Sequence, residues 1–183
     1  MSRPIEIHGY AIVSQDDRIA GADGQTPDAL RNEADWAYFQ RELDRADIVA
    51  IGRLGHEANP NPRGRRRLVL SRAANGLEQR ADAWWWNPDR LGWTEACAAL
   101  LPAGGRVAVP GGRDVFDLFL ATGYEAFHLS RAERVTLGAG RALFSACERG
   151  VGASTVLVGA GLRPDDPEVL DAAADVTLTV WRR

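Results

Sequence analysis

The sequence predicts an α/β fold with a mostly parallel central sheet, helices on both faces of that sheet and antiparallel strands at one edge. The first reason is that short apolar runs alternate with segments of helical spacing over most of the chain, as in sheets joined by crossover helices. The second is that we find no helical pattern in the last third. The third is that the tail, DVTLTVWRR, ends on regular apolar–polar alternation, which is typical of an edge strand.

The first half of the chain alternates strand and helix patterns. IEIHGYAIV (5–13) is apolar enough for a strand, whereas the next twenty residues (14–33) are polar and contain Asp-Gly and proline. A loop of that length inside one domain is usually a functional lid or a disordered segment. Apolar residues recur with helical spacing in 35–46. The apolar runs DIVAIG (47–52) and RRLVLS (66–71) then predict two strands.

The middle of the chain continues the same alternation. Residues 56–64 are rich in proline, asparagine and glycine, so we expect a loop there, with His56 at the surface. AWWW (83–86) predicts a short strand whose tryptophans alternate between core and surface. WTEACAALL (93–101) predicts a helix that stops before Gly-Gly, and RVAV (106–109) predicts a strand.

The remaining elements complete a single domain over residues 1–183. RDVFDLFLAT (113–122) predicts a helix, AFHLSRAER (126–134) a strand, and the tail (175–183) a last strand. The chain contains no internal repeat, low-complexity tract or linker, and its 183 residues suit one domain.

Composition excludes several classes of protein. A net charge of −3 argues against a general nucleic-acid binder. No apolar run is long enough for a membrane span and the N-terminus lacks a signal-peptide pattern, so we expect a cytoplasmic protein. Cys97 and Cys147 are far apart and suit buried thiols in a reducing compartment. The histidines (His8, His56 and His128) show no metal-ligand spacing, so no metal site is predicted.

The stretch VAVPGGRDVFDLFL (107–120) places two glycines between a strand and a helix. The free N–H groups of a first helical turn and the helix dipole favour a phosphate group. A side chain at Gly111 or Gly112 would hinder its approach. A tight turn without a ligand is the alternative that this pair alone leaves open.

Two other predicted strand ends strengthen the phosphate interpretation. AIGR ends a strand at Gly52 and Arg53, and VLSR ends another at Ser71 and Arg72. Carboxyl ends of parallel strands lie along one edge, where ligands bind. Two arginines beside a helix N-terminus suit several phosphates, as in NADPH with its 2′-phosphate. Each arginine alone would more often be a solvated surface residue.

Five segments in order resemble the dihydrofolate reductase family. They are AIVSQDDRIAG, ADWAYFQREL, AIGR followed by GRRRLVLSR, VPGGRDVF and FHLSRAE. The resemblance extends from Ile5 to about Phe144, and VTLTVWRR adds a plausible terminal strand. It implies the three-layer fold of dihydrofolate reductase and its superfamily, which also includes riboflavin-pathway pyrimidine reductases.

The resemblance also implies roles for individual residues. Asp35 matches the acid that anchors the amino-pyrimidine of the pterin and assists proton delivery, and Ser130 matches the hydroxyl that links this acid to the pterin amine. These are the expected catalytic residues. Residues with an expected role in substrate binding are Ile12, Trp36, Phe39, Arg65 (for the folate α-carboxylate) and Pro110. Residues with an expected role in binding NADPH are Val13, Ala20, Gly52, Arg53, Ser71, Arg72, Gly111, Gly112, Arg113 and Asp114. In this family the two glycines are often joined by a cis peptide.

The chemistry of Asp35 supports its role independently. Hydride transfer to an imine needs a protonated ring nitrogen, and a half-buried carboxyl with a raised pKa can help to supply that proton. It can also hold a guanidine-like edge through charge-assisted hydrogen bonds. The alternative is that Asp35 caps the helix that begins there, since aspartate is a favoured N-cap residue.

Some positions depart from the family pattern. The lid lacks the usual tryptophan after its proline and has about two extra residues before Asp35. Trp36 replaces a smaller apolar residue and would narrow the channel for the aryl tail of the substrate. Pro110 alters the shape where a backbone carbonyl usually meets the pterin. Leu54 and Gly55 replace a basic residue and a threonine that often contact phosphates.

The sequence therefore predicts an NADPH-dependent oxidoreductase that reduces a small-molecule dihydropterin, with dihydrofolate as the first expectation. Alternatives with the same chemistry are dihydromethanopterin and a riboflavin-pathway ribosylamino-pyrimidine. Asp35 counts against the pyrimidine, because those reductases generally lack an acid there. A third alternative is a non-catalytic nucleotide-binding protein, against which Asp35, Phe39 and Ser130 together argue. A monomer or a homodimer is expected, without a nucleic-acid or membrane partner.

Overall fold

The computed structural model describes residues 3–183 and contains a ten-stranded central sheet. Along the sheet the order is β10-β12-β8-β1-β7-β3-β4-β6-β5, and β11 pairs with β12. The neighbours from β8 to β6 are parallel, whereas β12 and β5 pair antiparallel to β8 and β6. The strands are β1 (Ile5–Ser14), β3 (Ile48–Gly52), β4 (Arg67–Leu70), β5 (Leu77–Gln79), β6 (Trp84–Trp86), β7 (Gly105–Val109), β8 (Ala126–Ala132), β10 (Arg163–Pro164), β11 (Glu168–Asp171) and β12 (Val176–Arg182). The predicted parallel sheet with an antiparallel C-terminal edge is confirmed.

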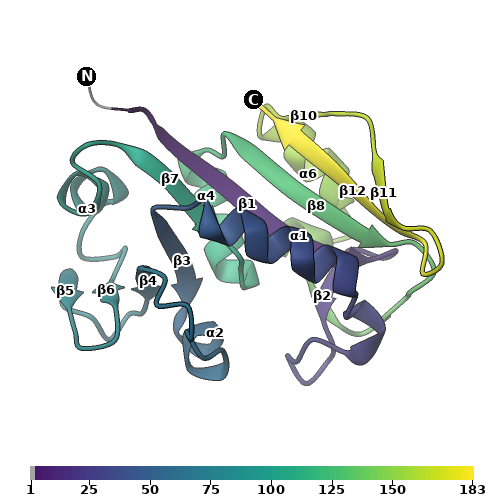
Figure 1. The fold of residues 1–183 in the computed structure, drawn as a ribbon, viewed down its shortest axis with the longest axis horizontal. Coiled ribbons are helices and arrows are strands. Elements are labelled where there is room, and N and C mark those ends of the chain that lie inside the picture. The colour runs from purple at the N-terminus through teal and green to yellow at the C-terminus, as the bar shows by residue number, and fades with distance from the viewer. Residues whose placement is uncertain (1–2) are drawn as a thin grey trace.

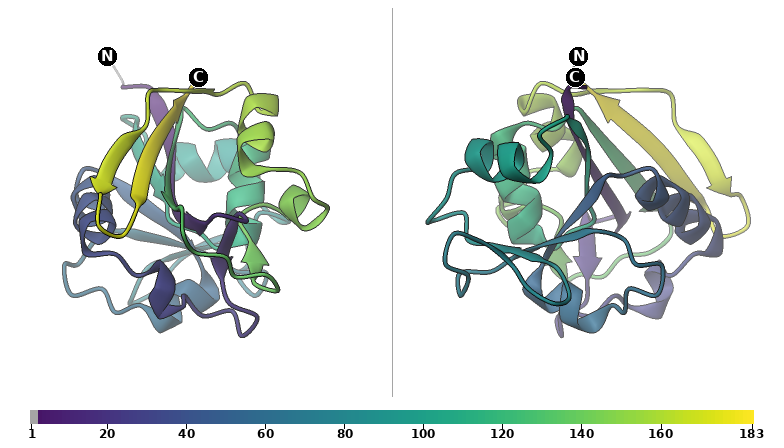
Figure 2. Two further views of the ribbon diagram at one scale, coloured as in Figure 1. Left: turned by 90° about the vertical axis from the view of Figure 1, so that its right-hand side faces the viewer. Right: turned by 60° about the vertical axis from the view of Figure 1, so that its left-hand side comes forward.

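Helices cover both faces of this sheet, as predicted. They are α1 (Glu33–Asp44), α2 (Arg53–Ala58), α3 (Trp93–Leu100), α4 (Arg113–Thr122), α5 (Ser145–Glu148) and α6 (Ala153–Gly159), with a 3₁₀ turn at Asp28–Leu30. In Figures 1 and 2, α1 lies on one face of the sheet, and α4 and α6 lie on the other. Among residues 3–183, none of the helices combines the length and the apolar character that crossing a membrane requires.

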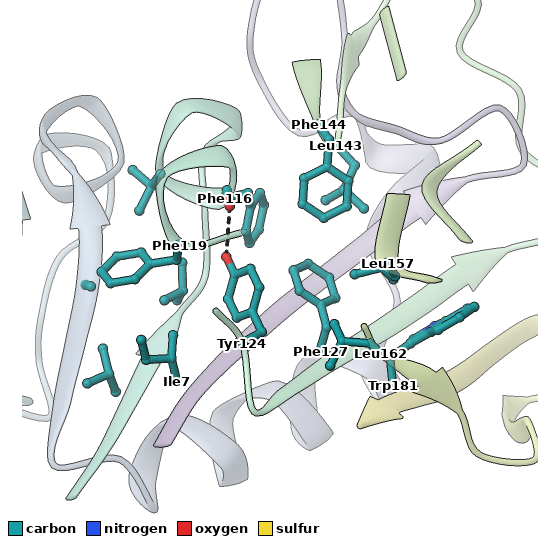
Figure 3. Close-up of a cluster of buried hydrophobic side chains, with 14 of the residues drawn as sticks. Ile7, Phe116, Phe119, Tyr124, Phe127, Leu143, Phe144, Leu157, Leu162 and Trp181 are labelled. Carbon is teal, nitrogen blue, oxygen red and sulfur yellow. Dashed lines mark hydrogen bonds between the residues drawn. The ribbon is translucent and has the colours of Figure 1, made fainter. Parts of the chain in front are cut away.

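The face toward α3, α4 and α6 carries the main apolar core (Figure 3). Phe127 of β8 is fully buried there, and its ring centroid lies 5.5 Å from that of Phe116 and 5.1 Å from that of Tyr124. Gly9 of β1 makes this packing possible, because a Cβ at that position would lie 2.3 Å from the Phe127 ring. Alternate residues of β1 and β8 point into this core.

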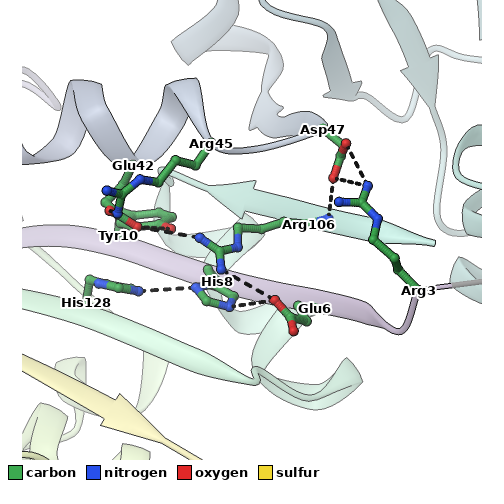
Figure 4. A network of polar contacts seen from close by, with 9 residues as sticks. All are labelled: Arg3, Glu6, His8, Tyr10, Glu42, Arg45, Asp47, Arg106 and His128. Carbon is green, nitrogen blue, oxygen red and sulfur yellow. Dashed lines mark hydrogen bonds and ion pairs between the residues drawn. The ribbon is translucent and has the colours of Figure 1, made fainter.

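The opposite face of the same strands is polar and aromatic. His8 and Tyr10 of β1 and His128 of β8 are buried on the side of α1 (Figure 4), and Ser130 of β8 is buried as well. The register pairs Tyr10 with His128 and Ile12 with Ser130, so these side chains form adjacent rows beneath the helix. This layer leads to the sheet edge at which the candidate site lies.

The expectation that the last third lacks helices is wrong, because α5 and α6 lie there. Helix α6 has the sequence ASTVLVG, whose β-branched residues favour a strand pattern. Its buried residues Ala153 and Leu157 are four positions apart, so one helical face packs on the core. Helix α5 is only four residues long, which is too short to show a period.

The polar segment after β1 is more ordered than predicted. Within the expected loop at residues 14–33, β2 (Arg18–Ala20) pairs with β9 (Arg141–Ala142) in a separate two-stranded sheet. This pairing joins residues more than a hundred positions apart, which a local pattern cannot reveal. The lid segment is thereby attached to the chain that follows β8.

Two surface assignments were also wrong. His56 lies in α2 rather than in a loop, and its Nε2 is 2.8 Å from Asp82 while its ring packs edge-on against Trp85. The tryptophans of β6 alternate faces as predicted, but Trp85 is 8% exposed, because a second cluster around Ile51 covers its face. Both cysteines are buried free thiols, as predicted.

Candidate functional site

The predicted convergence of strand ends is present in the structure. The backbone N–H of Gly52, at the end of β3, donates to the carbonyl of Gly111, just after β7, at 3.4 Å. On the other side of β7, Ile12 of β1 lies opposite Ser130 of β8. The carboxyl ends of these strands therefore form one edge, where ligands of open α/β sheets bind.

Helix α1 brings Asp35 to this edge. The N-cap is Asn32, whose side-chain oxygen accepts from the Asp35 backbone N–H at 3.1 Å, and the helix begins at Glu33. Asp35 is therefore the third helical residue, and the alternative that it is the N-cap is wrong. Its carboxyl group is free to face β8.

Asp35 and Ser130 meet beneath the start of α1. Burial raises the pKa of the Asp35 carboxyl above its usual range, and the nearby Ser130 side chain partly opposes this rise. Ser130 itself is 2% exposed. A carboxyl in such a position holds a proton at a higher pH than a solvated one, and it can donate or accept beside a ligand.

Aromatic and apolar side chains surround this pair. Phe39 packs on Tyr10, with ring centroids 6.3 Å apart, and Trp36 packs on Phe39 at 5.7 Å. Trp36 is 58% exposed, so it stands at the rim and presents a ring face to solvent. Ile12 packs against Leu30 in a neighbouring cluster. The structure thus brings together the predicted substrate-binding residues near Asp35.

The glycine pair has the geometry expected of a phosphate cradle. The Gly111–Gly112 peptide is cis, and Gly111 has φ +113°, a conformation that side chains rarely adopt. Gly112 is the N-cap of the ten-residue helix α4 and supplies no side-chain cap. A Cβ added at Gly112 would meet no atom within 4 Å, so the space over the helix N-terminus is open to an anion.

The side chains that begin α4 point away from this cradle or into solvent. The Nη1 of Arg113 lies 3.0 Å from Glu148, which also accepts from Arg18 at 3.0 Å. The Asp114 side chain is 88% exposed. Their expected contribution to cofactor binding could therefore come most directly from their backbone N–H groups. Pro110, which follows β7, is partly buried.

The two predicted phosphate arginines differ in their surroundings. Both carboxylate oxygens of Glu57 accept from Arg53 Nη1 at 3.0 Å. Arg72 is exposed, and within residues 3–183 its side chain makes no hydrogen bond or ion pair. Ser71 Oγ accepts from the backbone N–H of Ala73 at 3.2 Å. Arg72 is therefore available to an anion, whereas Arg53 must first leave Glu57.

Two of the residues expected to bind the cofactor are buried. The side chain of Val13 is fully buried in the main apolar core, and Ala20 is 6% exposed. The β-strand alternation explains Val13, because it follows Ile12 and so points to the opposite face. Only backbone atoms of Val13 could face a ligand at the sheet edge.

Arg65 has internal partners at the position expected to grip a substrate carboxylate. Its Nε and Nη2 donate to Asp44 Oδ1 at 2.9 and 2.7 Å, and its Nη2 also donates to the Gln40 side chain at 2.8 Å. Arg63 contacts the second oxygen of the same carboxylate. These contacts fix the guanidinium against α1, and only Nη1 lacks a partner among the described residues.

Sequence reasoning missed Tyr38 and His128. The Tyr38 hydroxyl lies 2.5 Å from His128 Nδ1. A usable signal existed, because Tyr38 is three residues after Asp35 in the helix and His128 is two residues before Ser130 in the strand. Both spacings place the pairs on the same face of their elements.

No protein-family model matches the chain. No curated protein sequence matches it either. Solved structures are similar over the whole chain. One is a dihydrofolate reductase from Enterococcus faecalis complexed with NADP(H) and RAB-propyl, with 15% identity, a TM-score of 0.68 and coverage of 100% of this chain and 99% of that one.

Two further structures have names from riboflavin synthesis. A Shewanella sp. PV-4 protein named for riboflavin biosynthesis has 19% identity, a TM-score of 0.68 and coverage of 98% and 99%. A diaminohydroxyphosphoribosylaminopyrimidine deaminase/5-amino-6-(5-phosphoribosylamino)uracil reductase from Thermotoga maritima has 16% identity, a TM-score of 0.64 and coverage of 98% of this chain and 56% of that one. At these identities the likeness establishes the fold: this chain has the dihydrofolate reductase-like fold that the sequence predicted.

Proposed function

We propose that the protein is an NADPH-dependent reductase that reduces a C=N bond of a dihydropterin, with dihydrofolate as the first substrate to test. The observation that carries the proposal is the Asp35–Ser130 pair at the carboxyl edge of the sheet, with the pKa of Asp35 raised by burial. The pair faces the same edge as the glycine cradle, so a substrate and a cofactor could meet there.

Asp35 has two tasks in this proposal. Its carboxylate would orient the amino-pyrimidine edge through charge-assisted hydrogen bonds, and its protonated form would help to supply the proton that the ring nitrogen gains. Ser130 would hold the carboxyl in position. Trp36 and Phe39 would pack on the aromatic ring of the substrate and exclude water from it.

The residues present suit a phosphorylated dinucleotide. Gly111, Gly112 and the first turn of α4 would hold the pyrophosphate, and the free guanidinium of Arg72 would meet the 2′-phosphate. Arg53 would join after exchanging Glu57 for phosphate. When bound, the nicotinamide cofactor supplies the hydride.

A riboflavin-pathway pyrimidine is the second candidate substrate. The likeness to two structures with names from that pathway favours it, whereas Asp35 favours the pterin. A non-catalytic nucleotide-binding protein is the third possibility. NADPH oxidation followed by absorbance would separate the three, with dihydrofolate, a dihydropterin without a glutamate tail and the ribosylamino-pyrimidine as substrates. Cofactor binding without oxidation in all three assays would favour the non-catalytic protein.

Arg65 distinguishes the pterins. If dihydrofolate is the substrate and Arg65 Nη1 takes its carboxylate, Arg65→Ala should raise the KM for dihydrofolate about tenfold. The KM for the tailless pterin should hardly change. Asp44 and Gln40 already hold Arg65. If Arg65→Ala leaves the KM for dihydrofolate unchanged, Arg65 has only these internal partners, and the substrate has a different tail. Trp36→Leu should then improve the use of dihydrofolate.

A further inference from the structure

A row of hydrogen-bonding groups runs through the polar layer beneath α1. His128 Nδ1 lies 2.5 Å from the Tyr38 hydroxyl, and His128 Nε2 lies 3.2 Å from His8 Nδ1. His8 Nε2 lies 3.7 Å from a carboxylate oxygen of Glu6. Figure 4 shows His128, His8 and Glu6 in this order along the sheet. We call these four residues the Tyr38–Glu6 chain.

Both imidazole rings are buried and neutral. Burial, with the nearby Arg106, lowers the pKa of His8 to about 4, and burial with His8 lowers that of His128 to about 3. A neutral imidazole carries one donor and one acceptor nitrogen. Two orientations of the chain are therefore possible, one with every donor directed toward Glu6 and one with every donor directed toward Tyr38.

One end of the chain lies beside the candidate site. Asp35 and Tyr38 are three residues apart in α1, and their partners Ser130 and His128 are two apart on the same face of β8. Side chains three apart on a helix have Cβ atoms about 5–6 Å apart. A path from Tyr38 to Asp35 needs one water molecule between the hydroxyl and the carboxyl.

The other end opens to solvent. His8 and Glu6 line a cavity of about 220 Å³ at the amino-terminal edge of β1, and Arg106 and Arg182 line it as well. This cavity lies at the opposite end of β1 from the candidate site. Basic and acidic residues both line this cavity.

We infer that the Tyr38–Glu6 chain is a proton path that returns a proton from solvent to Asp35 after each turnover, which adds Tyr38, His128 and His8 to the residues serving the reaction. This inference rests on the proposed function. Tyr38 would be the last member of the proton path before Asp35 and would take no part in hydride transfer. The histidines would act through Tyr38.

Proton transfer uses the orientation in which every donor is directed toward Tyr38. A solvent proton binds His8 Nε2, and His8 Nδ1–H passes its proton to His128 Nε2. His128 Nδ1–H passes its proton to the Tyr38 oxygen, whose own proton moves through one water to the Asp35 carboxylate. One proton enters and one leaves, no ring gains net charge, and the two rings end in the opposite tautomer. Tautomer exchange then restores the starting orientation.

Charged groups surround the chain from every neighbouring element. They are Glu6 of β1, Glu42 and Arg45 of α1, Arg106 of β7, Glu168 of β11 and Arg182 of β12. The Arg106 guanidinium contacts both Glu6 and Glu42. Opposite charges are thus paired around the rings, and burial keeps each histidine neutral.

The test compares Tyr38→Phe and His128→Gln with the control Tyr10→Phe. Tyr10 stacks on His128 and its hydroxyl donates to Glu42, so the control removes a hydroxyl from the same layer without removing a hydrogen bond of the chain. Steady-state oxidation of NADPH with the dihydropterin, over many turnovers, is measured across pH in H₂O and D₂O. We expect both test variants to be about tenfold slower at alkaline pH and nearly unchanged at acidic pH, where bulk solvent protonates Asp35 rapidly.

A second measurement needs no turnover. Imidazole nitrogen NMR shifts of the cofactor-free protein report which nitrogen of His8 carries the proton. Tyr38→Phe should change the tautomer balance of His8, which it does not contact, and Tyr10→Phe should not. If the wild-type protein turns over with the same pH and isotope profiles as both test variants, the proton path is overturned and the proposed function is not. Absence of turnover with every substrate would overturn the proposed function, and the path with it.

Discussion

The two faces of the central sheet use the same strands for opposite purposes. Toward α4 and α6, β1 and β8 present glycine, alanine, valine, leucine and phenylalanine to a continuous apolar core. Toward α1, the alternate residues of the same strands are mostly histidine, tyrosine and serine. A Phe127 and a His128 that are neighbours in sequence therefore lie in environments that differ in polarity.

This difference separates stability from chemistry. Close-packed aromatic side chains on one face gain burial energy and carry few polar groups, of which the Trp181 indole N–H is buried without a partner in the described part of the chain. The polar groups on the other face are buried with hydrogen-bond partners, which contributes little net stability but fixes the positions of groups that can bind or move protons. Substitutions on the two faces should accordingly fail in different ways.

The largest expected effect is on turnover, at Asp35 on the α1 face. Asp35→Asn keeps the shape and removes the acid, so turnover should fall roughly 10²–10⁴-fold at neutral pH, with little change in cofactor affinity. Steady-state kinetics and NADPH titration would measure both. Asp28→Asn, at a carboxylate whose side chain is 96% exposed, is the matched control. Near-normal turnover of Asp35→Asn would remove Asp35 from the mechanism.

The apolar face should respond in stability instead. Phe127→Ala should lower the free energy of unfolding by about 3–5 kcal/mol, because it leaves a cavity among Phe116, Tyr124 and Phe144. Trp36→Ala, at the exposed rim, should cost far less. Urea unfolding of both variants checks this contrast. Equal losses of unfolding free energy in the two variants would mean that the two sides of the sheet contribute equally to stability.

The buried histidines should make stability depend on pH. Their folded-state pKa values, about 4 for His8 and about 3 for His128, lie below the usual 6.5, so the unfolded chain binds protons first as pH falls. The stability that they contribute is complete above pH 6.5 and is lost on acidification, by roughly 2 kcal/mol for each histidine between pH 7 and pH 5. Urea unfolding at the two pH values measures the loss. A His8→Gln/His128→Gln double variant with the same pH slope would contradict this assignment.

The smallest of these effects concerns the sheet edge, outside both layers. A charge-assisted contact contributes roughly 1.5–3 kcal/mol, so Arg72→Ala should weaken NADPH binding about 10- to 150-fold. NADH binding should stay nearly unchanged, which makes it the internal control in a fluorescence titration. Equal weakening of both cofactors would show that Arg72 contacts a group they share.

The sequence by itself determined the order in which the parallel strands and the helices between them follow one another along the chain. It also determined the position of α4 and of the glycine pair before it. These features depend on neighbours in the chain: the apolar runs, the spacing of RDVFDLFLAT and the freedom of glycine at Gly111. Local patterns report such features because strands and helices bury residues with fixed periods. The nearness of Asp35 to Ser130 was predicted only through the family resemblance.

Only the tertiary structure decided which partners the polar side chains have. It joined His8 to His128 across 120 positions and held Arg65 against Asp44. It also added α5 and α6, whose short apolar sequences become helices where one face packs on the core. A hydrogen bond or an ion pair depends on distances of a few ångströms between distant segments. Those distances are set by how the whole chain packs, and no local periodicity encodes them.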